Sequence, residues 1–163
     1  MNAGIPTEVS ILTDVNVVAI GLTDDHPAHD DVFPWLRDAL DGPNTLLVPD
    51  YYPLRAQYIM TRNFGVETID ARNAVRSLLS SPARVVGATD TVLSEAHDIS
   101  AEKDHDVYDS FILSMARAHE VDFLVTTDDD FDALCEGEAV AYRNPVPADE
   151  RNRLSLVDGY SRI

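Results

Sequence analysis

Aspartates stand at two positions where the sequence predicts that a buried strand ends. Asp14 directly follows the apolar run 9–13, and Asp128 follows the run 123–126. In open α/β sheets, ligands bind at the edge formed by the carboxyl ends of the strands. A third acid, Asp109, begins a helix whose apolar spacing indicates that it faces the core, and this helix leads into the second of these strands. We therefore expect Asp14, Asp109 and Asp128 to converge at one edge of a sheet.

Carboxylates gathered in this way favour a divalent cation, because three or four of them cannot all stay ionised without positive charge among them. Asp106 lies one turn before Asp109 on the same side of the helix and is a further candidate ligand. The five histidines show no convincing metal-ligand spacing, and we expect surface or capping roles for them. Oxygen ligands alone favour Mg²⁺ or Mn²⁺. Each acid also has an ordinary interpretation as a solvated charge, and Asp109 as a helix cap, since the chain has 21 aspartates.

Short apolar runs alternate with amphipathic stretches of helix length, which is typical of an α/β fold with a largely parallel sheet. Strands are expected over residues 9–13, 45–48, 85–86, 123–126 and 139–142. Helices are expected over about residues 29–40, 50–64, 67–80, 89–98 and 107–119, with a short one after residue 128. The apolar run 17–20 is assigned to no helix. This order predicts one domain over residues 1–145 and a polar, partly ordered tail over residues 146–163.

The charge balance is strongly acidic. There are 29 acids against 12 bases, a formal net charge of -17, and Lys103 is the only lysine. At ordinary salt such a charge destabilises the compact state and repels nucleic acid. At molar salt the Debye length falls to about 3 Å, so both effects are largely screened. Surfaces rich in Asp and poor in Lys resemble those of proteins from halophilic archaea, which we expect as the source; an acidic mesophilic protein is the alternative.

Cysteine usage and hydropathy predict a cytoplasmic protein. No apolar run approaches the roughly 18 residues that a membrane-spanning helix needs. Residues 1–8 lack the basic start and apolar stretch of a secretory signal. The single cysteine, Cys135, excludes an internal disulfide and fits a reducing compartment. We therefore expect no membrane partner.

Three blocks of the sequence resemble the motifs of PIN domains. Residues 11–17 resemble the family's first motif, a strand that ends in Asp-x-Asn, and residues 108–116 resemble its central helix. Residues 126–131 match the Thr-x-Asp-x-x-Phe signature at the exit of a strand. The similarity spans most of residues 9–142. It implies a three-layer α/β/α sandwich with a mostly parallel central sheet.

The resemblance also implies a function and a set of site residues. PIN domains include the metal-dependent ribonucleases of VapC-type toxin–antitoxin pairs. By position, Asp14, Asp109 and Asp128 would be the catalytic metal ligands, with Asn16 and Thr126 in support. RNA, a cognate antitoxin protein and a second copy of the chain are the partners implied, the homodimer forming through the helices after the second strand.

One position departs from the family pattern. PIN domains usually carry a Glu early in the helix after the second strand, and in this chain that position falls near Arg55. Asp50 is the nearest acid that could replace it as a metal ligand. Arg55 and Arg62 are candidates for contacts with RNA phosphates, although on an acidic protein they could equally pair with carboxylates. Nearby tyrosines could stack on bases or pack in the core.

We expect metal-assisted phosphodiester hydrolysis of RNA, in which the carboxylates hold the ion and one of them accepts the proton of the attacking water. Two alternatives from other classes stay open. The first is a catalytically weakened PIN-like module that binds RNA or a partner. The second, more distant alternative is an aspartyl-phosphate phosphatase with Asp14 as nucleophile. That class needs Asp-x-Asp, whereas the second position here is Asn16.

Overall fold

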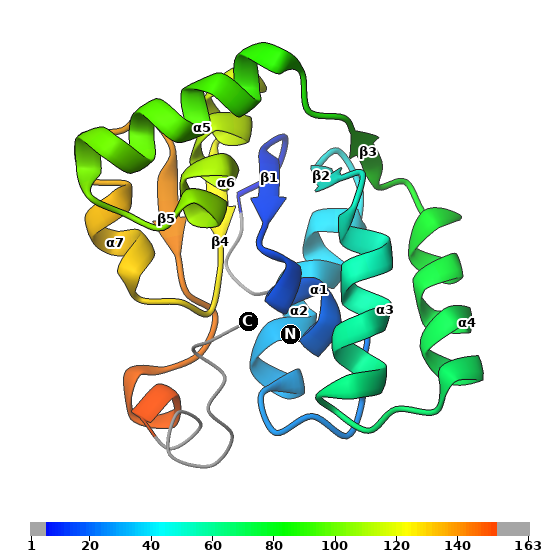
Figure 1. The fold of residues 1–163 in the computed structure, drawn as a ribbon. Helices are drawn as coiled ribbons and strands as arrows, with labels where there is room; N and C mark the ends of the chain where they lie inside the picture. Colours follow the sequence, from blue (N-terminus) through cyan, green and yellow to red (C-terminus); the bar gives the residue numbers. More distant parts are fainter. Residues whose placement is uncertain (1–5, 153–163) are drawn as a thin grey trace.

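The computed structural model describes residues 6–152, and its centre is a five-stranded sheet in which every pairing is parallel (Figure 1). The strands are β1 (Ser10–Thr13), β2 (Thr45–Pro49), β3 (Arg84–Val86), β4 (Phe123–Val125) and β5 (Ala141–Arg143). Their order across the sheet is β3-β2-β1-β4-β5. The α/β class and the parallel sheet expected from the sequence are therefore confirmed.

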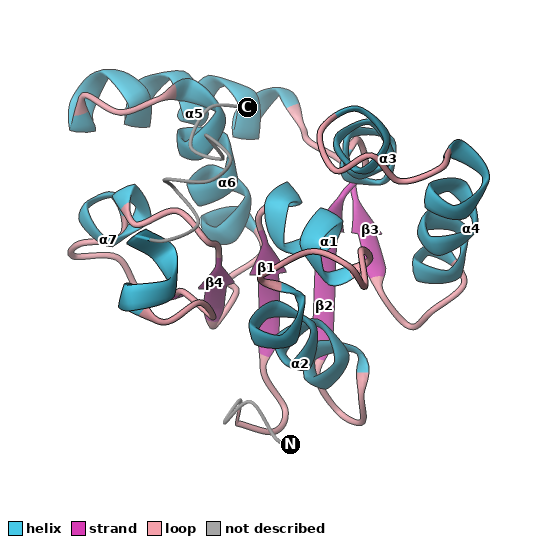
Figure 2. Cartoon of the chain, turned by 90° about the horizontal axis from the view of Figure 1, so that it is seen from below, coloured by secondary structure: helices cyan, strands magenta, loops and turns pink. Residues whose placement is uncertain are grey.

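Helices cover both faces of this sheet (Figures 1 and 2). They are α1 (Val15–Gly21), α2 (His29–Leu40), α3 (Tyr52–Arg62), α4 (Thr68–Leu79), α5 (Asp90–Lys103), α6 (Val107–Ala118) and α7 (Asp130–Leu134). α1 packs on α2 and α3, and α3 packs on α4, whereas α5 and α7 pack on α6. The helices thus form two groups, α1 to α4 and α5 to α7. Right-handed crossovers place these groups on opposite faces, because the chain moves across the sheet in one direction from β1 to β3 and in the other direction from β3 to β5. The result is the three-layer sandwich that the sequence predicts.

The strand order reverses between β1 and β4, and this is the crevice where open α/β sheets bind ligands. The ladder between the two strands continues past the end of β1, where the Asp14 N–H donates to the Val125 carbonyl at 2.9 Å. The acids that follow β1 and β4 are thus brought to the same point of the sheet edge.

The core explains why these segments fold as they do. Leu12 and Leu124 lie opposite each other in neighbouring strands and are 1% and 0% exposed. In α6, every residue from 110 to 116 is buried, as expected of a helix covered on all sides. α1 lies so close to α2 that a Cβ on Gly21 would meet Leu36 Cδ2 at 2.7 Å. Within the described residues no helix is long and apolar enough to cross a bilayer.

Three details differ from the sequence-based expectations. The run 17–20 belongs to a helix, α1, because Asp14 caps its first turn. α5 continues to Lys103, five residues beyond the expected end at 98, and stops at Asp104, whose φ of 50° is left-handed. β5 begins at Ala141, two residues later than expected.

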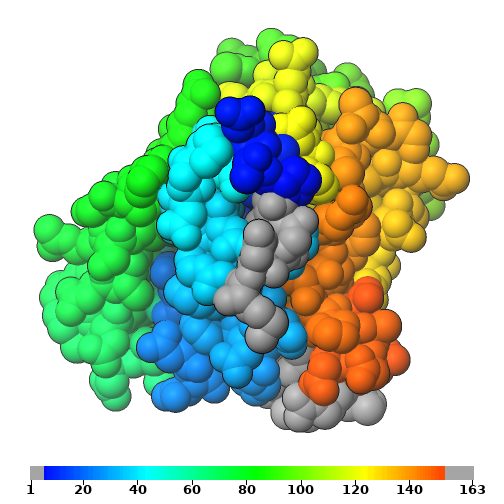
Figure 3. All heavy atoms as spheres, turned by 180° about the vertical axis from the view of Figure 1, so that it is seen from behind, coloured from blue at the N-terminus to red at the C-terminus, as the bar shows by residue number. Residues whose placement is uncertain are grey.

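The first part of the predicted C-terminal tail, residues 146–152, is described by the structure. The last described residues run on from β5 at one end of the molecule, where residues 148–152 are helical (Figures 1 and 3). Val146 is only 1% exposed and so anchors this part of the chain. The remainder of the predicted tail, 153–163, lies outside the described residues.

Candidate functional site

Asp14 is fixed by the end of β1 and the start of α1. Its backbone is extended, its side chain is 7% exposed, and its Oδ1 accepts a hydrogen bond from the Val15 N–H at 2.5 Å. Its Oδ2 accepts from the Thr126 hydroxyl at 3.1 Å. Both carboxylate oxygens are thus held by the protein.

Thr126 links the two acids that follow neighbouring strands. While its hydroxyl donates to Asp14, the same oxygen accepts from the Asp128 N–H at 3.1 Å. Thr126 is 0% exposed, and its own N–H donates to the Arg143 carbonyl at 3.1 Å, so the sheet fixes its position. One buried hydroxyl therefore sets the spacing between Asp14 and the loop that carries Asp128.

Asp109 reaches the same place from the first turn of α6. Asp106 caps this helix by accepting from the Tyr108 N–H at 2.8 Å and the Asp109 N–H at 3.3 Å. The Asp109 Oδ2 lies 3.2 Å from Nε2 of His105. Asp106 thus acts as a helix cap, and the side chain that the helix presents to the site is that of Asp109.

Residues 126–129 form the loop that connects β4 to α7. Asp128 Oδ1 accepts from the Asp130 N–H at 2.9 Å, and the Asp128 carbonyl accepts from the Tyr142 hydroxyl at 3.0 Å. Asp129 Oδ1 accepts from Asn144 Nδ2 at 3.2 Å and forms an ion pair with Arg151. The loop is therefore tied to β5 and to the segment that follows it.

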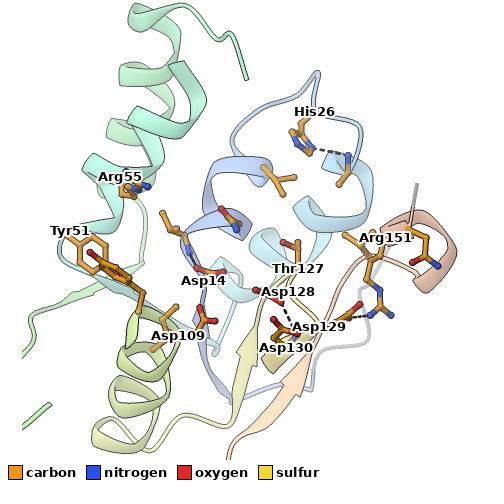
Figure 4. A pocket seen from close by; sticks show the side chains of 18 residues that line it. Asp14, His26, Tyr51, Arg55, Asp109, Thr127, Asp128, Asp129, Asp130 and Arg151 are labelled. Atoms are coloured by element: carbon orange, nitrogen blue, oxygen red, sulfur yellow. Dashed lines mark hydrogen bonds and ion pairs between the residues drawn. The ribbon is translucent and has the colours of Figure 1, made fainter. Parts of the chain in front are cut away.

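These elements enclose a pocket of about 630 Å³ (Figure 4). The side chains that line it include those of Asp14, Asp109 and Asp128, so the three acids expected to converge do share one pocket. Its remaining polar and aromatic lining residues are Asn16, His26, Tyr51, Arg55, Tyr108, Thr127, Asp129, Asp130, Arg151 and Asn152.

Burial and the charges of neighbouring acids raise the pKa values of the three carboxyls. Burial, opposed by the Thr126 and Val15 hydrogen bonds and reinforced by repulsion from Asp128, raises the pKa of Asp14 to about 6. Burial first, then the charges of Asp14 and Asp128, raise the pKa of Asp109 to about 7. The pKa of Asp128 is raised as well, chiefly by burial. A cation in the pocket would relieve all three, since an opposite charge favours the ionised carboxylate.

The chemical type of the three acids suits a divalent ion such as Mg²⁺ or Mn²⁺, because carboxylates supply hard oxygen ligands. As the side chains stand, no three His, Cys, Asp or Glu residues of the described chain lie close enough to hold a metal ion. The hydrogen bonds above hold the side chains in these positions, since both oxygens of Asp14 and one oxygen each of Asp109 and Asp128 have partners in the protein. Sharing one ion requires these side chains to turn.

The other residues singled out in the sequence fall into two groups. Asn16 and Arg55 line the pocket, whereas Asp50, Asp106 and Arg62 are not among its lining residues. Asp50 is exposed at the end of β2, where its N–H donates to the Val86 carbonyl at 2.9 Å. Asp50 therefore adds no carboxylate to this pocket.

Arg55 instead brings a positive charge to it. Its guanidinium lies 5.2 Å from the centre of the Tyr58 ring, a favourable cation–π distance. The side of the pocket formed by α3 thus carries a cation where the family resemblance implies an acid.

Sequence reasoning missed several residues of the site. His26 is buried in the pocket wall, and its Nδ1 accepts from the Ala28 N–H at 3.1 Å; His105 contacts Asp109. His26 is therefore not a surface residue, although its hydrogen bond with the Ala28 N–H lies at the start of α2, and His105 contacts one of the three acids. Arg151 and Asn152 come from the predicted tail. The spacing of histidines along the sequence could not reveal these two residues, because the tertiary structure is what brings each of them to the site.

The family comparison covers most of these elements. The family model of the PIN domain matches residues 11–137. The chain belongs to the PIN domain family. No curated protein matches the sequence closely enough to serve as a relative.

Solved structures share the PIN fold of this chain. VapC20 of Mycobacterium tuberculosis, a sarcin–ricin loop cleaving toxin, superposes with a TM-score of 0.62 at 17% identity over 76% of this chain and 93% of its own. VapBC2 of Rickettsia felis, bound to a DNA fragment from its promoter, superposes with a TM-score of 0.63 at 16% identity, covering 83% of this chain and 98% of that one. At such identities the likeness shows the fold alone.

Proposed function

We propose that this PIN domain is a divalent-metal-dependent ribonuclease that hydrolyses phosphodiester bonds of RNA. The observation that carries the proposal is the convergence of Asp14, Asp109 and Asp128, from three separate elements, in one pocket. Burial raises the pKa of each of the three carboxyls, and for Asp109 the charges of Asp14 and Asp128 add to it, so a bound cation would favour their ionised forms.

In this proposal the three aspartates hold one Mg²⁺ or Mn²⁺ ion, and water completes its coordination. The ion would supply the usual chemistry of such sites, lowering the pKa of a bound water and neutralising charge that develops on the phosphate. Thr126 keeps Asp14 and the Asp128 loop at a fixed spacing, and His105 orients Asp109. Asn16 lies beside Asp14 in the pocket wall and supports the same ligand set.

The rim of the pocket suits RNA. Arg55 offers a guanidinium to a phosphate, and two tyrosines, Tyr51 and Tyr108, line the pocket with 36% and 72% of their surface exposed. Tyr51 is held against Tyr52 and Phe111, with ring centroids 4.9 and 5.8 Å away, so its ring is a fixed surface on which a base can stack. Arg62 lies outside the pocket and is not part of this rim.

We further propose that the chain is the toxin of a toxin–antitoxin pair and forms a homodimer in the cytoplasm. The structural neighbours support the first part, since one is named as a toxin and the other is a toxin–antitoxin complex. Exposed apolar side chains on α3 and α4 support the second, among them Leu54, Tyr58 and Leu79, which are 76%, 51% and 50% exposed. The cytoplasmic location rests on the lone cysteine, Cys135, which is a buried thiol.

A catalytically weakened module that binds RNA or a partner is the second candidate. The observation that favours it is Arg55, whose positive charge lies on the side of the pocket where the family resemblance implies an acid and would oppose a nearby metal ion. In that case the chain would bind RNA without cutting it.

The deciding experiment measures cleavage of single-stranded RNA in molar KCl with Mn²⁺. Asp14→Asn and Asp128→Asn each remove a charged ligand and should reduce cleavage by orders of magnitude while the circular dichroism spectrum stays unchanged. Asp132→Asn, an exposed position on α7, removes the same charge and should cleave like the parent.

Chelation of the metal should abolish cleavage completely. Equal cleavage by the parent and Asp14→Asn would mean that the activity belongs to a contaminant, and the non-catalytic module would then be the better interpretation. Cleavage that persists in excess chelator would contradict the proposal equally, since these carboxylates need an ion to activate water.

A further inference from the structure

Two arginines, Arg55 and Arg151, are the only Lys or Arg residues among the described residues that line the pocket. They lie on opposite sides of it, with Asp14, Asp109 and Asp128 between them (Figure 4). Arg55 comes from α3 and Arg151 from the segment after β5. A polyanion that reaches the three acids therefore has one cation on each side.

Asp129 holds Arg151 in place. The Oδ1 of Asp129 accepts from Asn144 Nδ2 at 3.2 Å, lies 3.4 Å from the Tyr142 hydroxyl oxygen, and also pairs with the Arg151 guanidinium. The single carboxylate oxygen thus joins β5, the following turn and Arg151 to the loop next to Asp128.

The segment that carries Arg151 is itself built into the fold. The Val146 N–H donates to Asn144 Oδ1 at 3.0 Å, and the Val146 side chain is 1% exposed. The Arg151 N–H donates to the Pro147 carbonyl at 2.9 Å and closes a turn of helix. These bonds direct the arginine into the pocket.

The pair between Arg151 and Asp129 can be exchanged for a stronger one. The side chain of Asp129 is 62% exposed, and ion pairs in contact with solvent contribute little to stability. A phosphate offers the guanidinium two parallel, charge-assisted hydrogen bonds, which are shorter and stronger. Phosphate binding would thus displace Asp129 from Arg151 at small cost.

We infer that Arg151 is an RNA-binding residue and that Arg55 and Arg151 hold phosphates on the two sides of the bond to be cut. With its scissile phosphate at the acids, an RNA strand places the preceding and following phosphates toward the two arginines. Asp129 keeps Arg151 aimed at the pocket when RNA is absent. The inference rests on the proposed function and deepens it by giving the path of the strand.

The salt dependence of RNA binding tests the inference without a catalytic readout. For single strands, each phosphate contact contributes about 0.7 to the slope of log K against log salt. We would measure the anisotropy of a labelled single-stranded RNA on an Asp14→Asn chain, which does not cut it, at KCl concentrations above that needed for folding. Adding Arg151→Gln should lower the slope by about 0.7 and weaken binding several-fold.

Matched variants separate the contact from general charge. Arg72→Gln removes the same charge from an exposed position on α4, away from the pocket, and should leave the slope unchanged. Arg151→Lys keeps the charge and should retain the slope. Asp129→Asn should tighten binding more than Asp132→Asn does, because Asp129 pairs with Arg151. Circular dichroism verifies the fold of each variant.

The outcomes distinguish failure of this inference from failure of the proposed ribonuclease function. If the parent cuts RNA and Arg151→Gln binds with an unchanged slope, then Arg151 contacts no phosphate; the inference is wrong and the ribonuclease proposal stands. If the parent neither binds nor cuts RNA, both fail. A slope that falls equally in Arg151→Gln and Arg72→Gln would show a general charge effect and would also overturn the inference.

Discussion

Asparagine in place of Asp14 should make the metal-free chain more stable at neutral and alkaline pH. Burial raises the pKa of the Asp14 carboxyl to about 6, whereas an unfolded aspartate titrates near pH ~3.9. Between these two values the folded state keeps its proton while the unfolded state releases it. Stability rises with pH only where the unfolded state binds more protons, so here it falls as the pH rises from about 4 to about 6.

The size of the effect follows from the pKa shift of about two units. At about 1.36 kcal/mol per unit, the ionised Asp14 lowers the free energy of unfolding by about 3 kcal/mol above pH ~6. Asparagine carries no charge and avoids this loss. It can still accept from the Val15 N–H and donate to the Thr126 oxygen, so we subtract about 1 kcal/mol for altered hydrogen bonds. The net gain is about 2 kcal/mol at pH 8, or roughly 4–8 °C in Tm for a domain of this size.

The assay is thermal unfolding followed by circular dichroism in molar KCl with a chelator, from pH 4 to pH 8. We expect Asp14→Asn to be slightly less stable than the parent at pH 4 and clearly more stable at pH 8. Asp132→Asn, at an exposed position, should show no such crossover. A difference between Asp14→Asn and the parent that stays constant across the range would refute the reasoning, since it would show that the buried charge is not the cause.

Three further predictions concern the surface, the assembly and the metal. If the acidic surface is adapted to high salt, Tm should rise steeply from low salt to molar KCl, and a flat profile would remove that explanation. Light scattering in high salt should give twice the chain mass of 18.0 kDa, and Tyr58→Glu on α3 should shift the mass toward the monomer; a parent mass near 18.0 kDa at high protein concentration would contradict the dimer. Thr126→Val removes the hydroxyl between Asp14 and Asp128 and should weaken Mn²⁺ binding by about 10- to 100-fold in calorimetry, whereas unchanged affinity would show that the hydroxyl does not organise the ligands.

The acids after strands could be predicted because their signal is local. Asp14 and Asp128 each follow a short apolar run, and parallel strands necessarily bring their carboxyl ends to one edge. Asp109 could be predicted from its place on a core-facing helix. α1 could not, because an apolar run of four residues does not distinguish a strand from a helix. The capping hydrogen bond from the Val15 N–H to Asp14 is what marks the helix, and it is visible only in the structure.

Arg151 could not be found from the sequence, because its partner Asp129 stands 22 residues earlier and no periodicity links them. The burial of Val146, which anchors the first part of the tail, is likewise visible only in the structure. Asp50 was a candidate metal ligand because it follows a strand, β2, as Asp14 and Asp128 follow theirs. In the structure its backbone N–H continues the ladder to the Val86 carbonyl, and Asp50 lies outside the pocket. The direction in which the chain leaves a strand depends on how that strand pairs with its neighbours, and the sequence of one strand does not reveal it.

The net charge of -17 repels RNA at ordinary salt, but the placement of the arginines is compatible with RNA binding at high salt. Repulsion by the whole surface acts over distances of the Debye length, which at molar salt is about 3 Å. Contacts between a guanidinium and a phosphate act within that distance and survive. Two arginines at the pocket therefore decide more about binding than 29 acids spread over the chain. On this argument we expect the overall charge to reflect the salt in which the protein works, and the placement of Arg55 and Arg151 to reflect the RNA partner that we propose.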